Sequence, residues 1–154
     1  MNRHATHRES EHLCHMDHSC DFGADPFVTN IRQETLKNQC FRRALWTGEY
    51  LQLTSLMCIP VGGEIGLELH PDTDQFIRLE SGQGMVKMGE CKEHLDFQKC
   101  ICQDDVVLIP AGKWHNIVNT GRCPLKVYSI YAPPHHPYGT IHKTKAEADE
   151  SEDE

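Results

Sequence analysis

The most constraining feature of the sequence is a series of short apolar or alternating runs, each ended by a turn signal. The runs follow one another at roughly ten-residue spacing, separated by glycine, proline, aspartate or asparagine. This spacing favours an all-β sandwich or barrel over alternating strands and helices. A short helix is expected at 33–38. The expected strands are 41–46, 50–59, 65–70, 76–80, 85–88, 106–109, 114–118 and 125–131.

The two ends of the chain differ from this middle part. Residues 1–26 are polar and show no periodicity long enough to bury a face, so we expect a disordered arm. An alternative is a transition-metal-binding segment, since the arm is rich in His and Cys. Its candidate ligands are His12, Cys14, His15, His18 and Cys20. Residues 143–154 are expected to form an acidic disordered tail, which leaves 27–142 as the folded domain.

The distribution of charge argues against a nucleic-acid-binding protein. The formal net charge is -8, and six of the acidic residues lie in the last eight positions. The rest of the chain has 17 acidic against 15 basic residues, so it is nearly neutral. A nucleic-acid-binding protein needs a basic stripe to neutralise phosphates, and the sequence has none.

The apolar runs are too short for a membrane protein. The run at 106–109 is a few residues long, whereas about 20 are needed to span a bilayer. The first residues contain no apolar core of a secretory signal, so a cytoplasmic protein is expected. The 8 cysteines are then read as thiols and not as a disulfide framework. Several strands are apolar on both faces, which favours a second subunit and hence a homodimer.

Four polar side chains from three parts of the chain form the candidate site. Glu68 and His70 are two apart on the expected strand 65–70, so they project to the same side. Gln75 opens the next strand after a tight turn, and His115 follows much later. Together they offer a carboxylate oxygen, an amide oxygen and two imidazole nitrogens. This mixed set suits Mn, Fe, Ni or Zn.

The spacing of these residues resembles the two motifs of the cupin superfamily. Residues 63–84 resemble the first motif, with Glu68, His70 and Gln75 at its ligand positions and Gly82 at its closing glycine. Residues 104–119 resemble the second motif. Pro110, Gly112, His115 and Asn119 fit it, while Asp104 replaces its opening glycine. The resemblance covers residues 41–131 and implies a double-stranded β-helix, the jelly-roll barrel of cupins, with one divalent metal ion in its mouth.

The resemblance also implies a function. The chain is similar to small cupins described as mannose-6-phosphate isomerase-like, which implies Lewis-acid catalysis on a sugar phosphate, uronate or similar polar metabolite. Relative to the commonest cupin ligand set, Glu68 replaces a histidine and Gln75 replaces a glutamate. An iron-dependent dioxygenase and a non-catalytic metal- or ligand-binding cupin are the alternatives, and a metal-free barrel is a further one. His136 or Tyr138, in the proline-rich segment after the last strand, is a candidate acid or base, although packing explains this segment more simply.

Overall fold

The structure of the chain is a computed structural model that describes residues 21–152. Within that range it contains two short helices and antiparallel strands, which confirms the all-β prediction. The elements are α1 (Ile31–Lys37), β1 (Arg42–Arg43), β2 (Trp46–Thr47), β3 (Gln52–Ile59), β4 (Asp74–Ser81), β5 (Gln83–Gly89), β6 (Phe97–Cys102), β7 (Val106–Ile109), β8 (Trp114–Asn119), β9 (Leu125–Ala132), β10 (Ile141–His142) and α2 (Lys145–Glu152).

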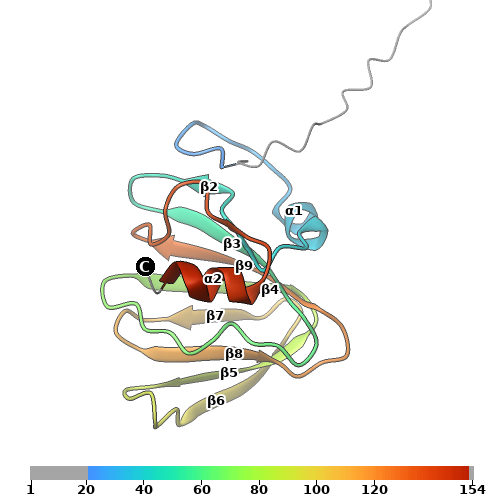
Figure 1. Cartoon of the computed structure of the whole chain (residues 1–154), viewed down its shortest axis with the longest axis vertical. Helices are drawn as coiled ribbons and strands as arrows, with labels where there is room; N and C mark the ends of the chain where they lie inside the picture. Colours follow the sequence, from blue (N-terminus) through green and yellow to red (C-terminus); the bar gives the residue numbers. More distant parts are fainter. Residues whose placement is uncertain (1–20, 153–154) are drawn as a thin grey trace, which may run out of the picture.

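The strands form two antiparallel sheets. The larger sheet has the order β10-β1-β3-β9-β4-β7, with β2 also paired to β3, and the smaller one has the order β6-β5-β8. Figure 1 shows β7, β4, β9 and β3 stacked above β8, β5 and β6. The order is far from sequential, because strands distant in the sequence pair with one another. This winding is that of a double-stranded β-helix.

The core lies between the sheets and follows the alternation of the strands. On β4 the buried side chains include Gln75, Ile77 and Leu79, while Phe76 and Arg78 face outward. Ile117 on β8 and Val127 on β9 are fully buried in the same cluster. The polar residue Gln75 therefore occupies an inward position at the end of an otherwise apolar row.

The segment that carries Glu68 and His70 is not a regular strand. The alternation predicts a strand at 65–70, but only isolated bridges join this segment to β8, from Glu64 to Val118 and from Glu68 to His115. Between them Gly66 has a φ of 109°, a backbone conformation that glycine adopts easily and other residues do not. The turn at Gly66 interrupts the ladder, and so the prediction of a continuous strand is wrong.

Besides His115, the second motif contains two residues, Asp104 and Asn119, that shape the turns before and after its strands. Asp104, in place of the usual glycine, has a φ of 72°, a conformation that Asp tolerates better than most residues. Asn119 ends β8: its side-chain nitrogen donates to the carbonyls of Ile59 and Cys123, both at 3.0 Å. Its oxygen accepts from Gly121 N at 2.9 Å. Asn119 thus fixes the turn that follows the strand.

The predicted helix at 33–38 corresponds to α1, which begins two residues earlier. Asn30 caps it, since its side-chain oxygen accepts from Gln33 N at 3.0 Å. At the other end the Lys126 ammonium, from β9, donates to the carbonyls of Leu36 and Asn38. This contact anchors the helix on the larger sheet.

The predicted disorder of the ends needs correction where the structure describes them. Positions 1–20 of the predicted arm lie outside the described residues. The five candidate ligands of its metal-binding alternative all lie within this part. Asp21, however, is buried and accepts hydrogen bonds from Gly23, Thr47 and Gly139. Phe22 N also donates to the carbonyl of Leu45, and the Asp25 carbonyl accepts from Trp46 Nε1, so residues 21–25 are bonded to the barrel and are not part of a disordered arm.

The acidic tail contains a helix, α2, in place of the predicted disorder. Ala148 is 1% exposed and belongs to the core cluster, so one small side chain anchors the helix. The Thr144 hydroxyl accepts from Glu147 N, as in a capping box, while the Glu147 carboxylate accepts from Lys143 N, one residue before the cap, at 2.7 Å. Among residues 21–152, no helix has the length and apolarity that crossing a membrane requires.

Candidate metal centre

The backbone brings Glu68 and His115 together. Glu68 N donates to His115 O at 2.9 Å, and His115 N donates to Glu68 O at 3.0 Å. Residues that exchange both hydrogen bonds lie directly opposite each other and project their side chains to the same face. Glu68 Oε2 is accordingly 3.8 Å from His115 Nε2.

His70 joins this pair from the same segment. Its carbonyl accepts from Gly112 N at 2.8 Å, a bond that ties it to the turn before β8. Its Nε2 lies 3.3 Å from Glu68 Oε2, and its ring centroid lies 5.2 Å from that of His115. One ligand atom from each of Glu68, His70 and His115 lies within 4.8 Å of the other two.

A hydrogen bond sets the orientation of the His115 ring. Its Nδ1 lies 2.9 Å from the carbonyl oxygen of Lys113, so Nδ1 carries the proton and donates it. Nε2 is then left with a lone pair directed toward Glu68 and His70. Histidines that bind metals typically donate their second ring nitrogen to a backbone carbonyl in this way.

Gln75, the fourth predicted residue, is held on the neighbouring sheet. Its side-chain nitrogen donates to the Tyr131 hydroxyl at 3.0 Å and to the Ser129 hydroxyl at 3.4 Å. Tyr131 in turn packs edge-on against His70, with ring centroids 5.5 Å apart. The nitrogen of Gln75 is therefore occupied by β9, and its oxygen, Oε1, is the atom left to act as a ligand.

Three buried atoms of this cluster have no hydrogen-bond partner within residues 21–152: His70 Nε2, His115 Nε2 and Gln75 Oε1. An unpartnered buried polar atom costs about 1–3 kcal/mol, so three in one place call for an explanation. Ligands bonded to one ion at about 2.0–2.2 Å are themselves separated by about 3.0–3.5 Å. The distances of 3.3 and 3.8 Å between Glu68 Oε2 and the two imidazoles are close to that range. The donor set therefore fits a divalent transition metal.

The charges around Glu68 keep it ionised. Burial raises the pKa of its carboxyl, but the neighbouring His70 imidazole and the Arg42 guanidinium outweigh burial and lower that pKa below its usual value. Burial lowers the pKa of His115, so this imidazole is neutral at neutral pH. An ionised carboxylate beside the neutral imidazole of His115 is the protonation state in which these two groups bind metals.

Two residues beside the site were not among the predicted ligands. Arg42 is 1% exposed, and its guanidinium lies 3.2 Å from Glu68 Oε1. His135 is exposed, and its ring packs at a tilt of 58° against the ring of His70, at a centroid distance of 4.2 Å. The sequence signals were an Arg-Arg pair, Arg42-Arg43, in an otherwise apolar run and a His-His pair after two prolines. Of the two candidate acid–base residues, His136 packs its ring on Tyr131, whereas the Tyr138 hydroxyl donates to the carbonyl of Asp21.

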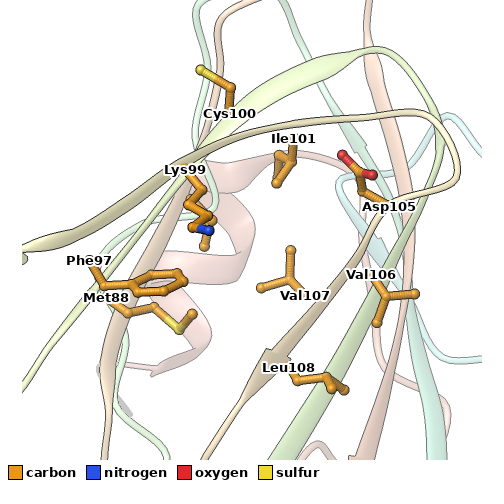
Figure 2. Close-up of a pocket in the computed structure, with 10 residues that line it drawn as sticks. Met88, Phe97, Lys99, Cys100, Ile101, Asp105, Val106, Val107 and Leu108 are labelled. Atoms are coloured by element: carbon orange, nitrogen blue, oxygen red, sulfur yellow. The ribbon is translucent and has the colours of Figure 1, made fainter.

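A separate cavity lies between the edge strands of the two sheets. It has a volume of about 460 Å³ and is lined mainly by apolar side chains, including Met88, Phe97, Val107 and Leu108 (Figure 2). None of the four candidate ligands is among its lining residues. Met88 pairs with His115 across β5 and β8, so the cavity begins next to the candidate centre without containing it.

Comparison with known proteins agrees with this geometry. Residues 55–131 match the cupin domain family. The chain is 56% identical over 133 residues to the uncharacterized protein YrkC of Bacillus subtilis strain 168, a match that covers 86% of this chain and 71% of YrkC. It is 40% identical over 116 residues to the uncharacterized protein L612 of Acanthamoeba polyphaga mimivirus, covering 75% of this chain and 70% of L612.

Solved structures show the same similarity. The crystal structure of BH2720 from Bacillus halodurans has a TM-score of 0.83 and 57% sequence identity, and the match covers 85% of this chain and 98% of BH2720. The crystal structure of TT1209 from Thermus thermophilus has a TM-score of 0.58 at 14% identity, covering 69% of this chain and 96% of TT1209. The second likeness concerns the fold alone.

Proposed function

The chain belongs to the cupin superfamily, and from this premise we propose that it is a metal-dependent enzyme whose metal ligands are Glu68, His70, Gln75 and His115. The observation that carries the proposal is the group of unpartnered buried atoms, His70 Nε2, His115 Nε2 and Gln75 Oε1, next to an ionised Glu68. Without a metal, His115 Nε2 and Gln75 Oε1 would stay buried and unsatisfied, and His70 Nε2 would have only the Glu68 carboxylate at 3.3 Å, whereas one divalent ion satisfies the three atoms together.

We propose that the reaction is an isomerisation of a sugar phosphate, a uronate or a similar polar metabolite. A bound divalent ion supplies Lewis-acid polarisation of a substrate oxygen, as in other metal-assisted reactions. Glu68 is the one anionic ligand of the proposed set, so the occupied centre keeps a net positive charge and attracts substrates with carboxylate, carbonyl or hydroxyl oxygens.

The residues around the ligands support the binding of a polar substrate. His135 is exposed beside His70, so its imidazole can hydrogen-bond the polar groups of a molecule bound at the centre. Gln52 holds His135 in place: its Oε1 accepts from the backbone nitrogens of His135 and His136, both at 3.0 Å. Its Nε2 donates to the His136 carbonyl at 2.8 Å. This fully buried glutamine makes the rim of the site rigid.

An iron-dependent dioxygenase is the second candidate function. The cluster of two histidines and one carboxylate, Glu68, His70 and His115, favours it, because this ligand set with open positions is typical of non-haem iron oxygenases. We rank the dioxygenase second because the fourth ligand of the proposed set, the Gln75 amide, is neutral. The third alternative, a non-catalytic metal-binding cupin, requires no substrate site.

One experiment distinguishes these functions. The protein is purified without a His-tag or chelating column, its metals are determined by elemental analysis, and sugar phosphates and uronates are then tested with the metal found. Turnover without oxygen supports the isomerase. Activity that disappears under anaerobic conditions supports the oxygenase, and bound metal without any turnover supports the non-catalytic cupin. Absence of metal at purification and on reloading would contradict all three.

Homodimer formation and cytoplasmic location remain predictions. Val106 and Leu108, on the edge strand β7, are 44% and 66% exposed and border the cavity in Figure 2. A second copy of the chain that covers this apolar edge would remove it from water. Sedimentation equilibrium of the purified protein measures the oligomeric state, and a monomer would contradict the dimer.

A further inference from the structure

The two oxygens of Glu68 have different surroundings. Oε2 faces the imidazoles, at 3.3 Å from His70 Nε2 and 3.8 Å from His115 Nε2. Oε1 faces away from them and lies 3.2 Å from Arg42 Nη2. We propose that Arg42, held in turn by Glu152 of the C-terminal helix, restricts Glu68 to a single metal-facing oxygen. Arg42 and Glu152 are therefore positioning residues, and the C-terminal helix is part of the metal centre.

Arg42 is placed to do this by the larger sheet. It lies on β1 and is opposite His142 of β10. Its side chain is 1% exposed, so its charge needs carboxylate partners. It has two: Nη2 lies 3.2 Å from Glu68 Oε1, and Nη1 lies 3.2 Å from Glu152 Oε1. The guanidinium thus bridges a proposed metal ligand and the end of α2.

The helix is fixed over the segment that carries Glu68. Ala148, in the middle of α2, packs in the core, and Glu152 is in the last turn. At its start, Lys145 lies against Gly66, where a Cβ atom would be 3.4 Å from the lysine Nζ. In Figure 1, α2 runs in front of the strands. One end of the helix therefore lies against Gly66, and the other end reaches Glu68 through Arg42.

The charges alternate from the metal site outward. The proposed cation is followed by the Glu68 carboxylate, the Arg42 guanidinium and the Glu152 carboxylate. Because Glu152 shares Arg42, the guanidinium competes less strongly with the cation for Glu68. Removal of the Glu152 charge leaves a buried guanidinium whose remaining carboxylate is the metal ligand. Cation binding is then weaker, and the guanidinium, no longer held by α2, can shift and change the orientation of the Glu68 carboxylate that it binds.

The test compares Co²⁺ binding by the full-length wild type, Glu152→Gln and Glu150→Gln. Both variants remove one negative charge from α2, and Glu150, an exposed residue of the same helix, is the matched control. Binding is measured by titration of metal-free protein, and the visible absorption of the Co²⁺ complex reports the ligand arrangement. We expect Glu152→Gln to weaken Co²⁺ binding by about three- to tenfold. This loss is smaller than the loss on removing a residue that bonds a metal ligand directly, because Glu152 acts through Arg42 and is half-exposed.

The two readouts separate this role from a structural one. The visible spectrum of the Glu152→Gln complex is expected to differ from that of the wild type, while the Glu150→Gln complex keeps both the wild-type affinity and the wild-type spectrum. Wild-type affinity and spectrum in Glu152→Gln would overturn the positioning role and leave the proposed function standing. The inference rests on the proposed metal site, so a wild type that takes up no Co²⁺ would overturn both.

Discussion

Glu68 and His115 are bound to each other by their main chains, since each donates its N–H to the carbonyl of the other, at 2.9 and 3.0 Å. The pairing places two of the proposed ligands on one face without any contribution from their side chains. It follows that either side chain can be replaced while the backbone frame of the site remains. The substitutions below use this property.

Replacement of His115 by alanine is expected to remove most of the bound metal and to leave the barrel folded. The substitution deletes the unpartnered Nε2 together with the Nδ1 bond to the Lys113 carbonyl, and it keeps both main-chain bonds to Glu68. We expect the unfolding free energy of the metal-free protein to fall by about 2–4 kcal/mol. Elemental analysis and denaturant unfolding measure the two effects.

The control for this substitution is His94→Ala, which removes an exposed histidine from the loop before β6. The control protein is expected to keep the metal content of the wild type. Equal metal content in His115→Ala and the wild type would contradict the assignment of His115 as a ligand.

Two substitutions at Gln75 are expected to act in opposite directions. Gln75→Glu provides an anionic oxygen in place of the amide oxygen and is expected to raise the affinity for a divalent ion by about tenfold. Gln75→Leu removes the oxygen and is expected to lower the affinity by a similar factor. Isothermal titration with Mn²⁺ or Zn²⁺ measures both. If the two variants bind equally well, Oε1 of Gln75 is not a ligand.

Gln52 is expected to contribute strongly to stability. Its side chain makes four hydrogen bonds, to the Thr47 hydroxyl, to the backbone nitrogens of His135 and His136, and to the His136 carbonyl. In Gln52→Leu the Thr47 hydroxyl keeps its bond to Asp21, but the other three groups lose the partner that Gln52 provides. The substitution is therefore expected to lower the unfolding free energy by about 3 kcal/mol. The exposed Gln98, with one bond to the carbonyl of Leu95, is the control, and Gln98→Leu is expected to change stability by less than about 0.5 kcal/mol. Similar losses in both would refute the role of Gln52.

The metal-free protein is expected to lose stability in mild acid because of His136. Burial, together with the charge of Arg42, lowers the pKa of His136 from 6.5 to about 2. Between these values the unfolded chain binds a proton that the folded chain does not, so the unfolding free energy falls as pH falls below 6.5. This group alone contributes up to about 1.4 kcal/mol per pH unit.

Urea unfolding at several pH values tests this assignment. His136→Phe keeps a ring against Tyr131 but cannot take up the proton, so the pH dependence of the variant is expected to be shallower than that of the wild type. Equal slopes from about pH 6 to about pH 4 would show that His136 does not cause the loss.

The spacing of the motifs predicted the site better than the local structure around it. The structure brings Glu68, His70 and His115 together as predicted, although the strand expected to carry two of them is interrupted at Gly66. The reason is that a ligand's position depends on where the backbone is anchored, here by the bonds to His115 and Gly112. A regular strand is not required.

Other features could not be predicted from the sequence, since they depend on distant contacts. Arg42 bonds to residues 26 and 110 positions away, and nothing local in the sequence indicates either partner. The helix α2 has a single buried side chain, Ala148, so it produces no apolar periodicity. Its only local signal is the capping sequence at 144–147, which an acidic composition obscures.

The central claim is that four side chains surround one cation, and anomalous X-ray diffraction tests it most directly. Crystals of protein loaded with Zn²⁺ or Mn²⁺ are measured on both sides of the absorption edge of the metal. The predicted result is one strong anomalous peak, bonded to Glu68 Oε2, Gln75 Oε1 and the Nε2 atoms of His70 and His115. A peak bonded to other residues, or none among these four in a protein shown to carry metal, would contradict the claim.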